Sequence, residues 1–501
     1  MDLSSARPLK VYVVPYPGPG HMVPLCELGR FFANRGQLVT IITTPSNVGK
    51  SFHSTPHSHL RFQTFDFPSQ EVGLPQGVEN FVAVSDGAGA AKIHMALRLL
   101  RQPIEEFIEK NPPDCIVADF FFPWTTDLAQ KLGIPRLVFF PYCAFAACMI
   151  KSTGELLQDD DFKKTLKSDS DPFIVPGLPH PITMTMSQLP NPAKLPKGVD
   201  EFGKVMKEAE LKSHGIVVNS FAEIDVEYTQ LYEKFTGKKL WPIGPPSLIH
   251  RSTEEKTQRS HKSVVGEQEC LSFLNSKKPN SVVYIAFGSA WSFPDNQLYE
   301  IARGIESSGH NFILVVFGKR EDETEEEREK WMPRGFEEKM KSENKGMIIR
   351  GWAPQLLILG HPAVGGFMTH CGWNSVLESV SAGVPMITWP LYFDHFYNEK
   401  LVTQVHGCGA VVGCEEYGLT AYEPKEKLVT QDMIEKAVRK VMDGGEEAAK
   451  MRSRIKELSE KAKKAVEEGG SSHNNLTVLI EELQRFRQSE ATKDTGGVLQ
   501  N

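Results

Sequence analysis

The stretch that decides the fold is LKVYVVPYPGPGHMVPLCELGRFFANRGQLVTIITTPSN, residues 9–47. Residues 9–17 are rich in β-branched and aromatic side chains and run into a Gly/Pro turn. Residues 24–36 have helical spacing and end at Gly36, a residue typical of a helix C-terminus. Residues 38–47 return to a strand pattern. A strand, a crossover helix and a second strand predict parallel strands in a doubly wound α/β domain.

The alternation of strand and helix patterns returns in two further parts of the chain. It recurs over residues 113–140 and again over residues 281–317. Between them, residues 250–266 lose apolar periodicity and fill with charged and hydroxyl side chains, which is typical of a linker. The predicted organisation is an N-terminal domain at 1–249, the linker at 250–266, a C-terminal domain at 267–470, a helix at 471–488 that packs back on the N-terminal domain, and a disordered tail at 489–501.

The composition argues against a nucleic-acid partner and a membrane span. The 501 residues carry a formal net charge of −7 from interspersed acids and bases, so no face is expected to neutralise many phosphates. The first residues show no export-signal pattern, and the longest apolar stretch, residues 137–150, is too short to cross a bilayer. The 8 cysteines form no CxxC pair, which is typical of free thiols in a reducing compartment. A cytoplasmic location is therefore expected.

A histidine and an aspartate follow two predicted strands of the N-terminal half. The PGPGH segment places His21 near the start of the first helix, and Asp119 ends the apolar run IVAD. Neutral imidazole accepts a proton near pH 7, and a carboxylate on one ring nitrogen fixes its tautomer. Because no GxSxG nucleophile motif accompanies them, the pair is expected to activate a hydroxyl of a substrate. The alternatives are a packing or capping role for His21 and capping of the helix near Thr125 by Asp119.

Residues 365–385, GGFMTHCGWNSVLESVSAGVP, predict a phosphate site at the start of a helix. A buried strand is expected to end at His370, and the helix that follows presents backbone N–H groups and the positive end of its dipole. Its first turn holds an indole, an amide and a hydroxyl, from Trp373, Asn374 and Ser375. On the same face Glu378 can accept two hydrogen bonds from a ribose diol, and upstream Trp352 can stack on a base. Together these groups predict binding of a nucleoside diphosphate.

Residue spacing argues against a nicotinamide cofactor and a metal ion. Gly18 and Gly20 lack the third glycine of a dinucleotide-binding loop, which also disfavours a nucleotide-sugar epimerase or dehydrogenase. The adjacent His370 and Cys371 fit no usual zinc-ligand spacing. The acidic pair in SDSDP, residues 168–172, is more typical of a solvated turn than of a metal clamp. We therefore expect neither a cofactor nor a metal ion.

Residues 352–395, from WAPQ to LYFDH, resemble the signature of the plant family 1 UDP-sugar-dependent glycosyltransferases along its whole length. The resemblance extends through the chain and includes PGPGHMVPL, the strand-end Asp119, AFGS and the closing GGSSHNN. Within that family the chain is most similar to the branch containing legume abscisate glucosyltransferase and soyasapogenol glucuronide galactosyltransferase. The resemblance implies a GT-B fold, in which two doubly wound Rossmann-like domains face each other across a cleft. The N-terminal domain would bind the acceptor and the C-terminal domain the UDP-sugar.

The resemblance also implies roles for individual residues. His21 would be the general base and Asp119 its partner, in an inverting transfer without a metal ion. The implied UDP-sugar site comprises Ser289, Trp352, Ala353, Gln355, His370, Trp373, Asn374, Ser375, Glu378, Asp394 and His395. The implied partners are a UDP-sugar donor and a small lipophilic acceptor, and we expect a monomer.

The last residue of the signature bears on the donor sugar. His395 stands where glucose-transferring members usually have Gln, as it does in several galactose-transferring members, so UDP-galactose is favoured over UDP-glucose. The branch likeness favours transfer to a hydroxyl or carboxyl of a triterpenoid saponin aglycone or glycoside. A UDP-glucose-dependent glucosyltransferase acting on abscisate or a flavonoid is the alternative. A more distant one is a non-catalytic UDP-sugar-binding protein, which would be expected to lack His21 or Asp119.

Overall fold

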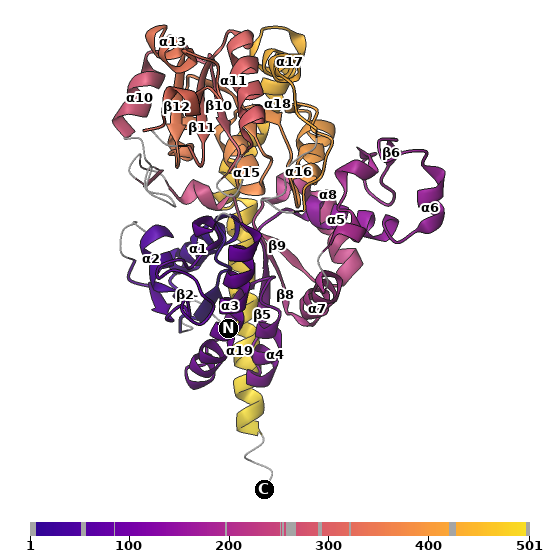
Figure 1. The fold of residues 1–501 in the computed structure, drawn as a ribbon. Coiled ribbons are helices and arrows are strands. Elements are labelled where there is room, and N and C mark those ends of the chain that lie inside the picture. The colour runs from indigo at the N-terminus through magenta and orange to yellow at the C-terminus, as the bar shows by residue number, and fades with distance from the viewer. Residues whose placement is uncertain are drawn as a thin grey trace. The chain divides into compact units, whose positions relative to one another are not determined.

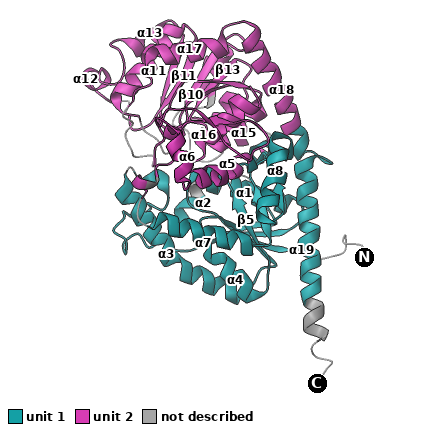
Figure 2. Ribbon diagram, turned by 90° about the vertical axis from the view of Figure 1, so that its right-hand side faces the viewer, with its two compact units in different colours: residues 1–144, 196–249, 463–501 teal, residues 145–195, 250–462 magenta. Residues whose placement is uncertain are grey.

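The computed structural model describes residues 7–51, 57–84, 86–195, 198–250, 252, 255–256, 267–288, 293–319, 322–419 and 427–496. The chain divides into two compact units (Figure 2). Unit 1 comprises residues 1–144, 196–249 and 463–501, and unit 2 comprises residues 145–195 and 250–462. Most of the predicted linker at 250–266 lies outside the described residues.

Unit 1 is built on a seven-stranded sheet with the strand order β3-β2-β1-β4-β5-β8-β9 (Figure 1). The strands are β1 (Lys10–Val14), β2 (Leu38–Thr43), β3 (Leu60–Thr64), β4 (Cys115–Asp119), β5 (Arg136–Phe140), β8 (Gly215–Val218) and β9 (Leu240–Pro242). Every neighbouring pair is parallel. The strand order reverses between β1 and β4, and in α/β sheets ligands bind at the carboxyl ends of the strands beside such a reversal.

Alternate residues of β1 face two different cores. The helices described in unit 1 include α1 (Pro19–Asn34), α2 (Pro45–Ser51), α3 (Gly87–Lys110), α4 (Trp124–Leu132), α7 (Val199–Lys212), α8 (Ala222–Thr236) and α19 (Ser471–Gly496). Val11 and Val13 pack with side chains of α1 and α19. Tyr12 and Val14 pack with side chains of α3 and α4. Successive side chains of β1 thus point to opposite faces of the sheet, and both faces are apolar. This pattern is that of a sheet covered by helices on each side.

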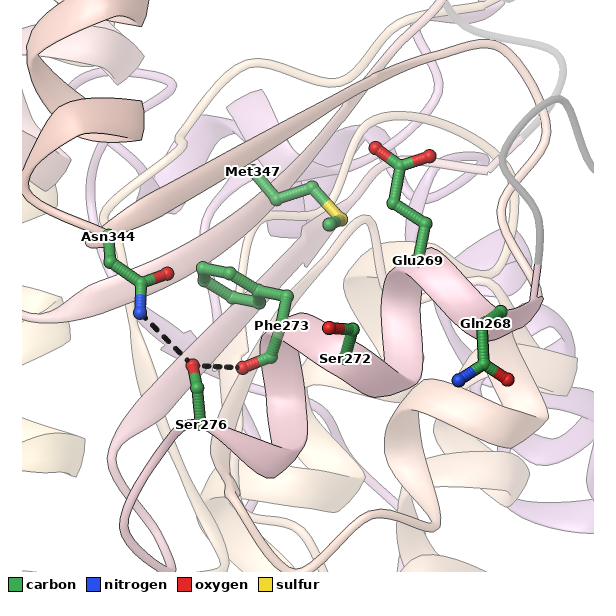
Figure 3. A pocket seen from close by; sticks show the side chains of 7 residues that line it. All are labelled: Gln268, Glu269, Ser272, Phe273, Ser276, Asn344 and Met347. Atoms are coloured by element: carbon green, nitrogen blue, oxygen red, sulfur yellow. Dashed lines mark hydrogen bonds between the residues drawn. The ribbon is translucent and has the colours of Figure 1, made fainter.

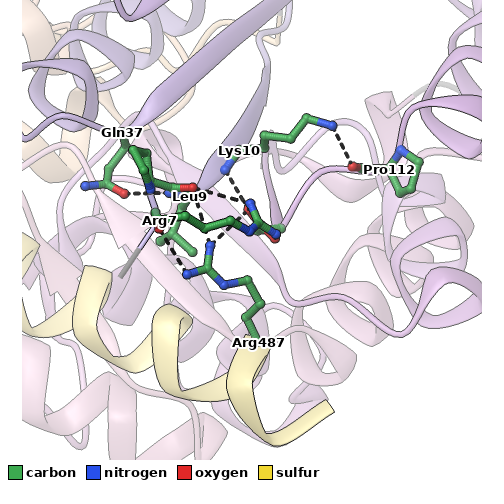
Figure 4. A network of polar contacts seen from close by, with 8 residues as sticks. Arg7, Leu9, Lys10, Gln37, Pro112 and Arg487 are labelled. Carbon is green, nitrogen blue, oxygen red and sulfur yellow. Dashed lines mark hydrogen bonds and ion pairs between the residues drawn. The ribbon is translucent and has the colours of Figure 1, made fainter. Parts of the chain in front are cut away.

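The C-terminal helix α19 is held in unit 1 by apolar and by polar contacts. Leu479 and Leu483 belong to the same core cluster as the β1 side chains. In the network of Figure 4, the guanidinium of Arg487 donates to the carbonyl of Arg7 (3.0 Å) and to the carboxylate of Asp114 (3.4 Å). Asp114 also accepts from the Arg7 guanidinium at 2.8 Å. One carboxylate therefore joins the start of β1, the start of β4 and Arg487 of α19.

The predicted disordered tail at 489–501 is partly wrong. Helix α19 continues to Gly496, and only residues 497–501 lie outside the described residues. Once core packing has formed a helix, adding a residue costs far less than starting a new one, and Glu, Ala and Lys in this segment are good helix formers. The polar composition that suggested disorder also suits a solvated helix end.

Unit 2 is built on a six-stranded sheet with the order β12-β11-β10-β13-β14-β15. The strands are β10 (Val282–Ala286), β11 (Asn311–Val316), β12 (Gly346–Arg350), β13 (Val364–Thr369), β14 (Met386–Thr388) and β15 (Gly409–Val411). All neighbouring pairs are parallel, and the order reverses between β10 and β13. The predicted α/β class, with two doubly wound Rossmann-like sheets, is confirmed.

The helices described around this sheet lie before β10, in the connections between the strands and after β15. They include α10 (Glu267–Asn275), α11 (Asp295–Ser308), α12 (Glu325–Arg328), α13 (Phe336–Ser342), α14 (Gln355–Leu359), α15 (Trp373–Ala382), α16 (His395–Lys400), α17 (Gln431–Met442) and α18 (Glu446–Val466), with a π-helical turn, η6, at Leu401–Val405. Gly304 lets α11 approach α17, since a Cβ there would lie 2.7 Å from the side chain of Ile434. No helix among the described residues is long and apolar enough to cross a membrane.

The segment 145–195 belongs to unit 2, which differs from the predicted domain at 1–249. It contains α5 (Ala144–Leu156), α6 (Asp160–Thr165) and a hairpin of β6 (Phe173–Ile174) and β7 (Thr183–Met184). The hydroxyl of Thr153 is hydrogen-bonded to that of Tyr397 at 2.8 Å. The side-chain amide of Gln404 bonds both the N–H and the carbonyl of Thr183, at 2.9 and 3.0 Å. The first contact joins residues that are 244 positions apart and the second joins residues that are 221 positions apart, so a local sequence pattern could not predict them. At the other boundary, residues 463–470 fall in unit 1 rather than in the predicted domain at 267–470.

Candidate active site

The predicted histidine and aspartate of unit 1 meet where the strand order reverses. His21 lies in the first turn of α1, after β1, and Asp119 is the last residue of β4. The Nδ1 atom of His21 lies 2.9 Å from Oδ2 of Asp119, whose side chain is completely buried. Since an ionised carboxylate only accepts hydrogen bonds, Nδ1 carries the proton and Nε2 carries the lone pair. The pair thus has the geometry of a base with its orienting carboxylate.

The capping alternatives for this pair are wrong. Helix α1 begins after Gly18 and helix α4 after Pro123, and neither has a side-chain cap. The second oxygen of Asp119 instead accepts the backbone N–H of Phe121 at 3.0 Å. Asp119 is therefore held by one bond from the loop that follows it and one bond from the imidazole.

Aromatic rings surround the imidazole of His21. Its ring centroid lies 5.3 Å from that of Tyr16, 5.7 Å from Phe120 and 5.4 Å from Phe121. The His21 side chain remains 23% exposed, so it is accessible within an apolar setting. Apolar surroundings strengthen the hydrogen bond to Asp119 because they lower the local dielectric. The same rings offer a surface for a lipophilic molecule.

A buried guanidinium near Asp119 is absent from the sequence prediction. Arg136 donates to Oγ1 of Thr125 and to Oγ of Ser213, each at 2.8 Å. Burial lowers the pKa of Arg136 to about 10, and the charges of Asp119 and Glu210 oppose that shift, so the side chain is a cation at neutral pH. A buried cation thus lies near the buried side chain of Asp119. In the sequence Arg136 only flanks an apolar strand, which gives no sign of burial.

The predicted nucleotide residues of unit 2 follow the carboxyl ends of four parallel strands. Trp352 and Ala353 follow β12, and His370 follows β13 and leads into α15. Asp394 and His395 follow β14. The fourth strand, β10, leads to Ser289, which lies outside the described residues. Because the carboxyl ends of parallel strands share one edge, the described groups belong to one edge of this sheet.

Two glycines enclose the imidazole of His370. A Cβ on Gly288 would lie 2.7 Å from its Nε2 atom, and a Cβ on Gly372 would lie 2.4 Å away. The imidazole packs edge to face against that of His395, with ring centroids 4.8 Å apart. Burial lowers the pKa of His370 to about 4, so the ring is neutral at pH 7. Its Nδ1 atom has no hydrogen-bond partner among the described residues. Positions 288 and 372 therefore require glycine, because a side chain at either would clash with the His370 ring.

A hydrogen-bonded set joins α14 and α15. The amide nitrogen of Gln355 donates to Oε2 of Glu378 at 2.7 Å and to Oγ of Ser375 at 3.2 Å. Its amide oxygen accepts from the hydroxyl of Tyr284 at 3.3 Å. Burial and the charge of Glu378 raise the pKa of Tyr284 well above its usual value, so its phenol stays a donor. Tyr284 is absent from the sequence prediction, because within the apolar run VVYIA its pattern is that of a core aromatic residue.

The remaining predicted residues differ in burial. Trp352 is half-buried, with its ring edge to face against Phe317 at 6.3 Å. Ala353 is 7% exposed and Trp373 is 4% exposed, whereas Asn374 is half-buried. Trp352 and Asn374 thus keep more surface that a ligand can contact than Trp373 does.

A hollow of about 590 Å³ in unit 2 lies away from these residues. It is open to solvent and lies between α10 and the start of β12, where Phe273, Asn344 and Met347 line it (Figure 3). This is the amino-terminal edge of the sheet, opposite to the edge that carries the predicted nucleotide residues, and none of those residues lines it. Within the described ranges, no group of three or more His, Cys, Asp or Glu side chains is arranged to hold a metal ion.

Comparisons with known proteins cover nearly the whole chain. Residues 245–452 match the family described as UDP-glucoronosyl and UDP-glucosyl transferase. UDP-glucosyl transferase 73CC6 of Saponaria officinalis is 52% identical over 97% of this chain and 99% of its own length. UDP-glucose flavonoid 3-O-glucosyltransferase 7 of Fragaria ananassa is 44% identical over 96% and 98%. The crystal structure of Glycyrrhiza uralensis UGT73P12, complexed with glycyrrhetinic acid 3-O-monoglucuronide, is 38% identical and superposes with a TM-score of 0.89 over 98% of this chain and 99% of that one.

Proposed function

Because the chain belongs to the plant family 1 UDP-glycosyltransferases, enzymes with the GT-B fold, we propose that it transfers a hexose from a UDP-sugar to a small lipophilic metabolite with inversion at the anomeric carbon. Family membership makes it a glycosyltransferase; the donor, the acceptor and the role of each residue are the proposal. The observation that carries the mechanism is the 2.9 Å contact between His21 and the buried Asp119.

His21 acts as the general base. Its Nε2 lone pair takes the proton of an acceptor hydroxyl while the oxygen attacks the anomeric carbon from the face opposite UDP. The bond to Asp119 keeps Nδ1 protonated and stabilises the imidazolium that forms. An α-linked donor then gives a β-glycoside.

The donor is held by the carboxyl edge of the unit 2 sheet. Trp352 stacks on uracil, with the Ala353 backbone and Gln355 on the nucleoside, and Glu378 accepts from the ribose hydroxyls. The first turn of α15, with its backbone N–H groups, faces the diphosphate. The proposed diphosphate contacts are Ser289, His370, Asn374 and Ser375, and the proposed sugar contacts are Trp373, Asp394 and His395. The diphosphate contacts stabilise the negative charge that develops on departing UDP. The proposed mechanism includes no metal ion.

The preferred donor is UDP-galactose, a choice that depends on His395. Its side chain is 5% exposed, and its Nδ1 atom accepts the backbone N–H of Tyr392 at 3.4 Å. The contact leaves Nε2 as the protonated nitrogen, a donor that a glutamine would replace with a longer amide. Galactose and glucose differ only at the 4-hydroxyl, so one hydrogen bond, about 0.5–1.5 kcal/mol, separates them. UDP-glucose is the competing donor, supported by the glucosyltransferase names of the two relatives.

The proposed acceptor is a triterpenoid saponin aglycone or glycoside. The Glycyrrhiza structure, 38% identical to this chain, is complexed with glycyrrhetinic acid 3-O-monoglucuronide. The rings around His21 supply an apolar surface, and the 40% exposed Phe202 extends it by stacking on Phe121 with centroids 6.4 Å apart. A flavonoid acceptor is the competing possibility, supported by the name of the Fragaria relative.

The test crosses UDP-galactose and UDP-glucose with triterpenoid, flavonoid and abscisate acceptors, and identifies the products by mass spectrometry. The wild type is expected to glycosylate a triterpenoid with UDP-galactose preferred, and His395→Gln to shift the kcat/KM ratio toward UDP-glucose by roughly two- to tenfold. His21→Ala should abolish transfer and leave UDP affinity near normal. Equal donor ratios for wild type and His395→Gln would end the donor argument. Strong turnover by His21→Ala would remove His21 as the base.

A further inference from the structure

Asn398 is a fully buried side chain that bonds two parts of the unit 2 site. It lies on α16, four residues after Asp394, and this spacing places both side chains on one face of the helix. Its Nδ2 atom donates to the carboxylate of Asp394 at 2.7 Å and to the backbone carbonyl of Cys371 at 2.9 Å. The two N–H bonds of one amide thus connect the loop after β14 to the loop after β13.

The Cys371 carbonyl belongs to a strained turn. Cys371 has a φ of +65°, in the left-handed region that is strained for a residue with a side chain. Oγ1 of Thr369 accepts the N–H of Cys371 at 3.3 Å, and Asn398 holds its carbonyl. This turn carries the chain from β13 into α15 and lies between His370 and Gly372. A Cβ on Gly372 would lie 2.4 Å from the imidazole of His370.

We propose that Asn398 is a positioning residue for the hexose–diphosphate end of the donor. This inference rests on the proposed function, in which Asp394 contacts the hexose and the loop after β13 contacts the diphosphate. With both N–H bonds in place, the Asp394 carboxylate has one fixed orientation relative to His370 and to the start of α15. Asn398 is too deeply buried to touch the donor itself, so it acts through Asp394 and the Cys371 carbonyl.

The uridine end of the proposed site depends on other bonds. Gln355 is hydrogen-bonded to Glu378 and to Tyr284, and neither contact includes Asn398. Loss of Asn398 should therefore weaken binding of the complete donor more than binding of its nucleoside monophosphate part. A residue that merely supported folding would weaken both ligands alike and lower the melting temperature.

The experiment measures dissociation constants for UMP and for UDP-galactose, without acceptor, in the wild type, Asn398→Ala and Asn398→Ser. The serine variant keeps one small polar group and is the one to interpret if the alanine variant fails to fold. Asn311→Ala is the matched control, since Asn311 also donates its amide to a backbone carbonyl of unit 2, that of Ser281 at 3.2 Å, at the opposite edge of the sheet. If UDP-glucose proves to be the preferred donor, it replaces UDP-galactose.

The expected result for Asn398→Ala is binding of UDP-galactose about tenfold weaker and a lower kcat, with UMP binding changed by less than about twofold. In an Asp394→Ala background, Asn398→Ala should add less than about threefold, because the two residues act as one unit. The control should bind both ligands like the wild type. Equal weakening of UMP and UDP-galactose, unchanged UDP-galactose binding, or full additivity with Asp394→Ala would overturn the inference. A wild type that transfers no sugar would instead reject the proposed function.

Discussion

Replacing Asp119 by asparagine tests the catalytic pair with almost no change of shape. The carboxylate accepts two hydrogen bonds, from the Phe121 N–H at 3.0 Å and from the His21 Nδ1–H at 2.9 Å. An amide has only one oxygen, so its NH2 group must face one of these two donors. Either choice breaks an interaction that the native carboxylate makes.

The two orientations of the amide differ in free energy. If the NH2 group faces Phe121, a buried backbone N–H loses its acceptor at a cost of about 1–3 kcal/mol. If it faces His21, it donates to Nδ1 and the imidazole proton moves to Nε2, which keeps every hydrogen bond. The second arrangement is therefore favoured by a factor of roughly 5 to 150. In that tautomer Nε2 has no lone pair for the acceptor proton. Together with the lost charge opposite the imidazolium, kcat should fall about 10²- to 10⁴-fold.

The assay is kcat with the best donor and acceptor, alongside calorimetric titration with UDP. UDP affinity should stay at the wild-type value, because no unit 2 contact changes. Asp114→Asn is the control: Asp114 precedes the same strand, β4, and accepts the N–H of Lys10 at 2.7 Å. It should lower stability and leave kcat intact. An Asp119→Asn enzyme within about threefold of the wild-type kcat would refute the tautomer argument.

Two further predictions concern stability. Arg487→Ala should lower stability by about 1 kcal/mol and the melting temperature by roughly 2 °C, because it removes bonds to Arg7 and Asp114. The matched variant is Arg485→Ala, whose guanidinium pairs with Glu481 on the exposed face of α19, and it should change neither quantity. Equal scanning-calorimetry shifts for both variants would contradict the anchoring role. The pKa of His370 is about 4 in the folded protein and near 6.5 in the unfolded chain, so between these pH values the unfolded state binds more protons. The free energy of unfolding should therefore fall by at most about 3 kcal/mol as the pH drops from 6.5 to 4. Urea denaturation at pH 7.5 and 4.5 should show a smaller pH effect for His370→Asn; parallel pH dependence in both proteins would contradict the buried neutral ring.

The sequence predicts those residues whose position depends on strand ends. His21 and Asp119 each follow an apolar run, and parallel strands bring their carboxyl ends to one edge whatever the details of packing. The same rule collects Trp352, His370 and Asp394 at one edge of the second sheet. Strand patterns repeat every two residues and can therefore be recognised in the sequence without a structure.

Residues whose role depends on burial cannot be identified from strand patterns. Tyr284 and Arg136 lie in or beside apolar runs, and Asn398 lies in a short polar helix, so nothing local shows that their polar atoms bond partners distant in the sequence. The membership of residues 145–195 in unit 2 has the same cause, since the Thr153–Tyr397 bond spans 244 positions. Such contacts are products of tertiary packing and leave no periodic trace.

The two sheets have the same reversal of strand order but different chemistry at the loops beside it. In unit 1 the strand β4 ends in Asp119 and is followed by three phenylalanines, two of which lie beside the imidazole that Asp119 bonds. In unit 2 the corresponding strand β13 is followed by His370, Cys371 and Gly372, so a neutral imidazole leads directly to a helix start. An apolar setting suits a lipophilic acceptor whose hydroxyl must lose a proton, whereas a helix start suits a charged leaving group. Because the topology is common to both units, the proposed donor and acceptor functions depend on the few residues after each fourth strand, and substitutions there should change chemistry more than fold.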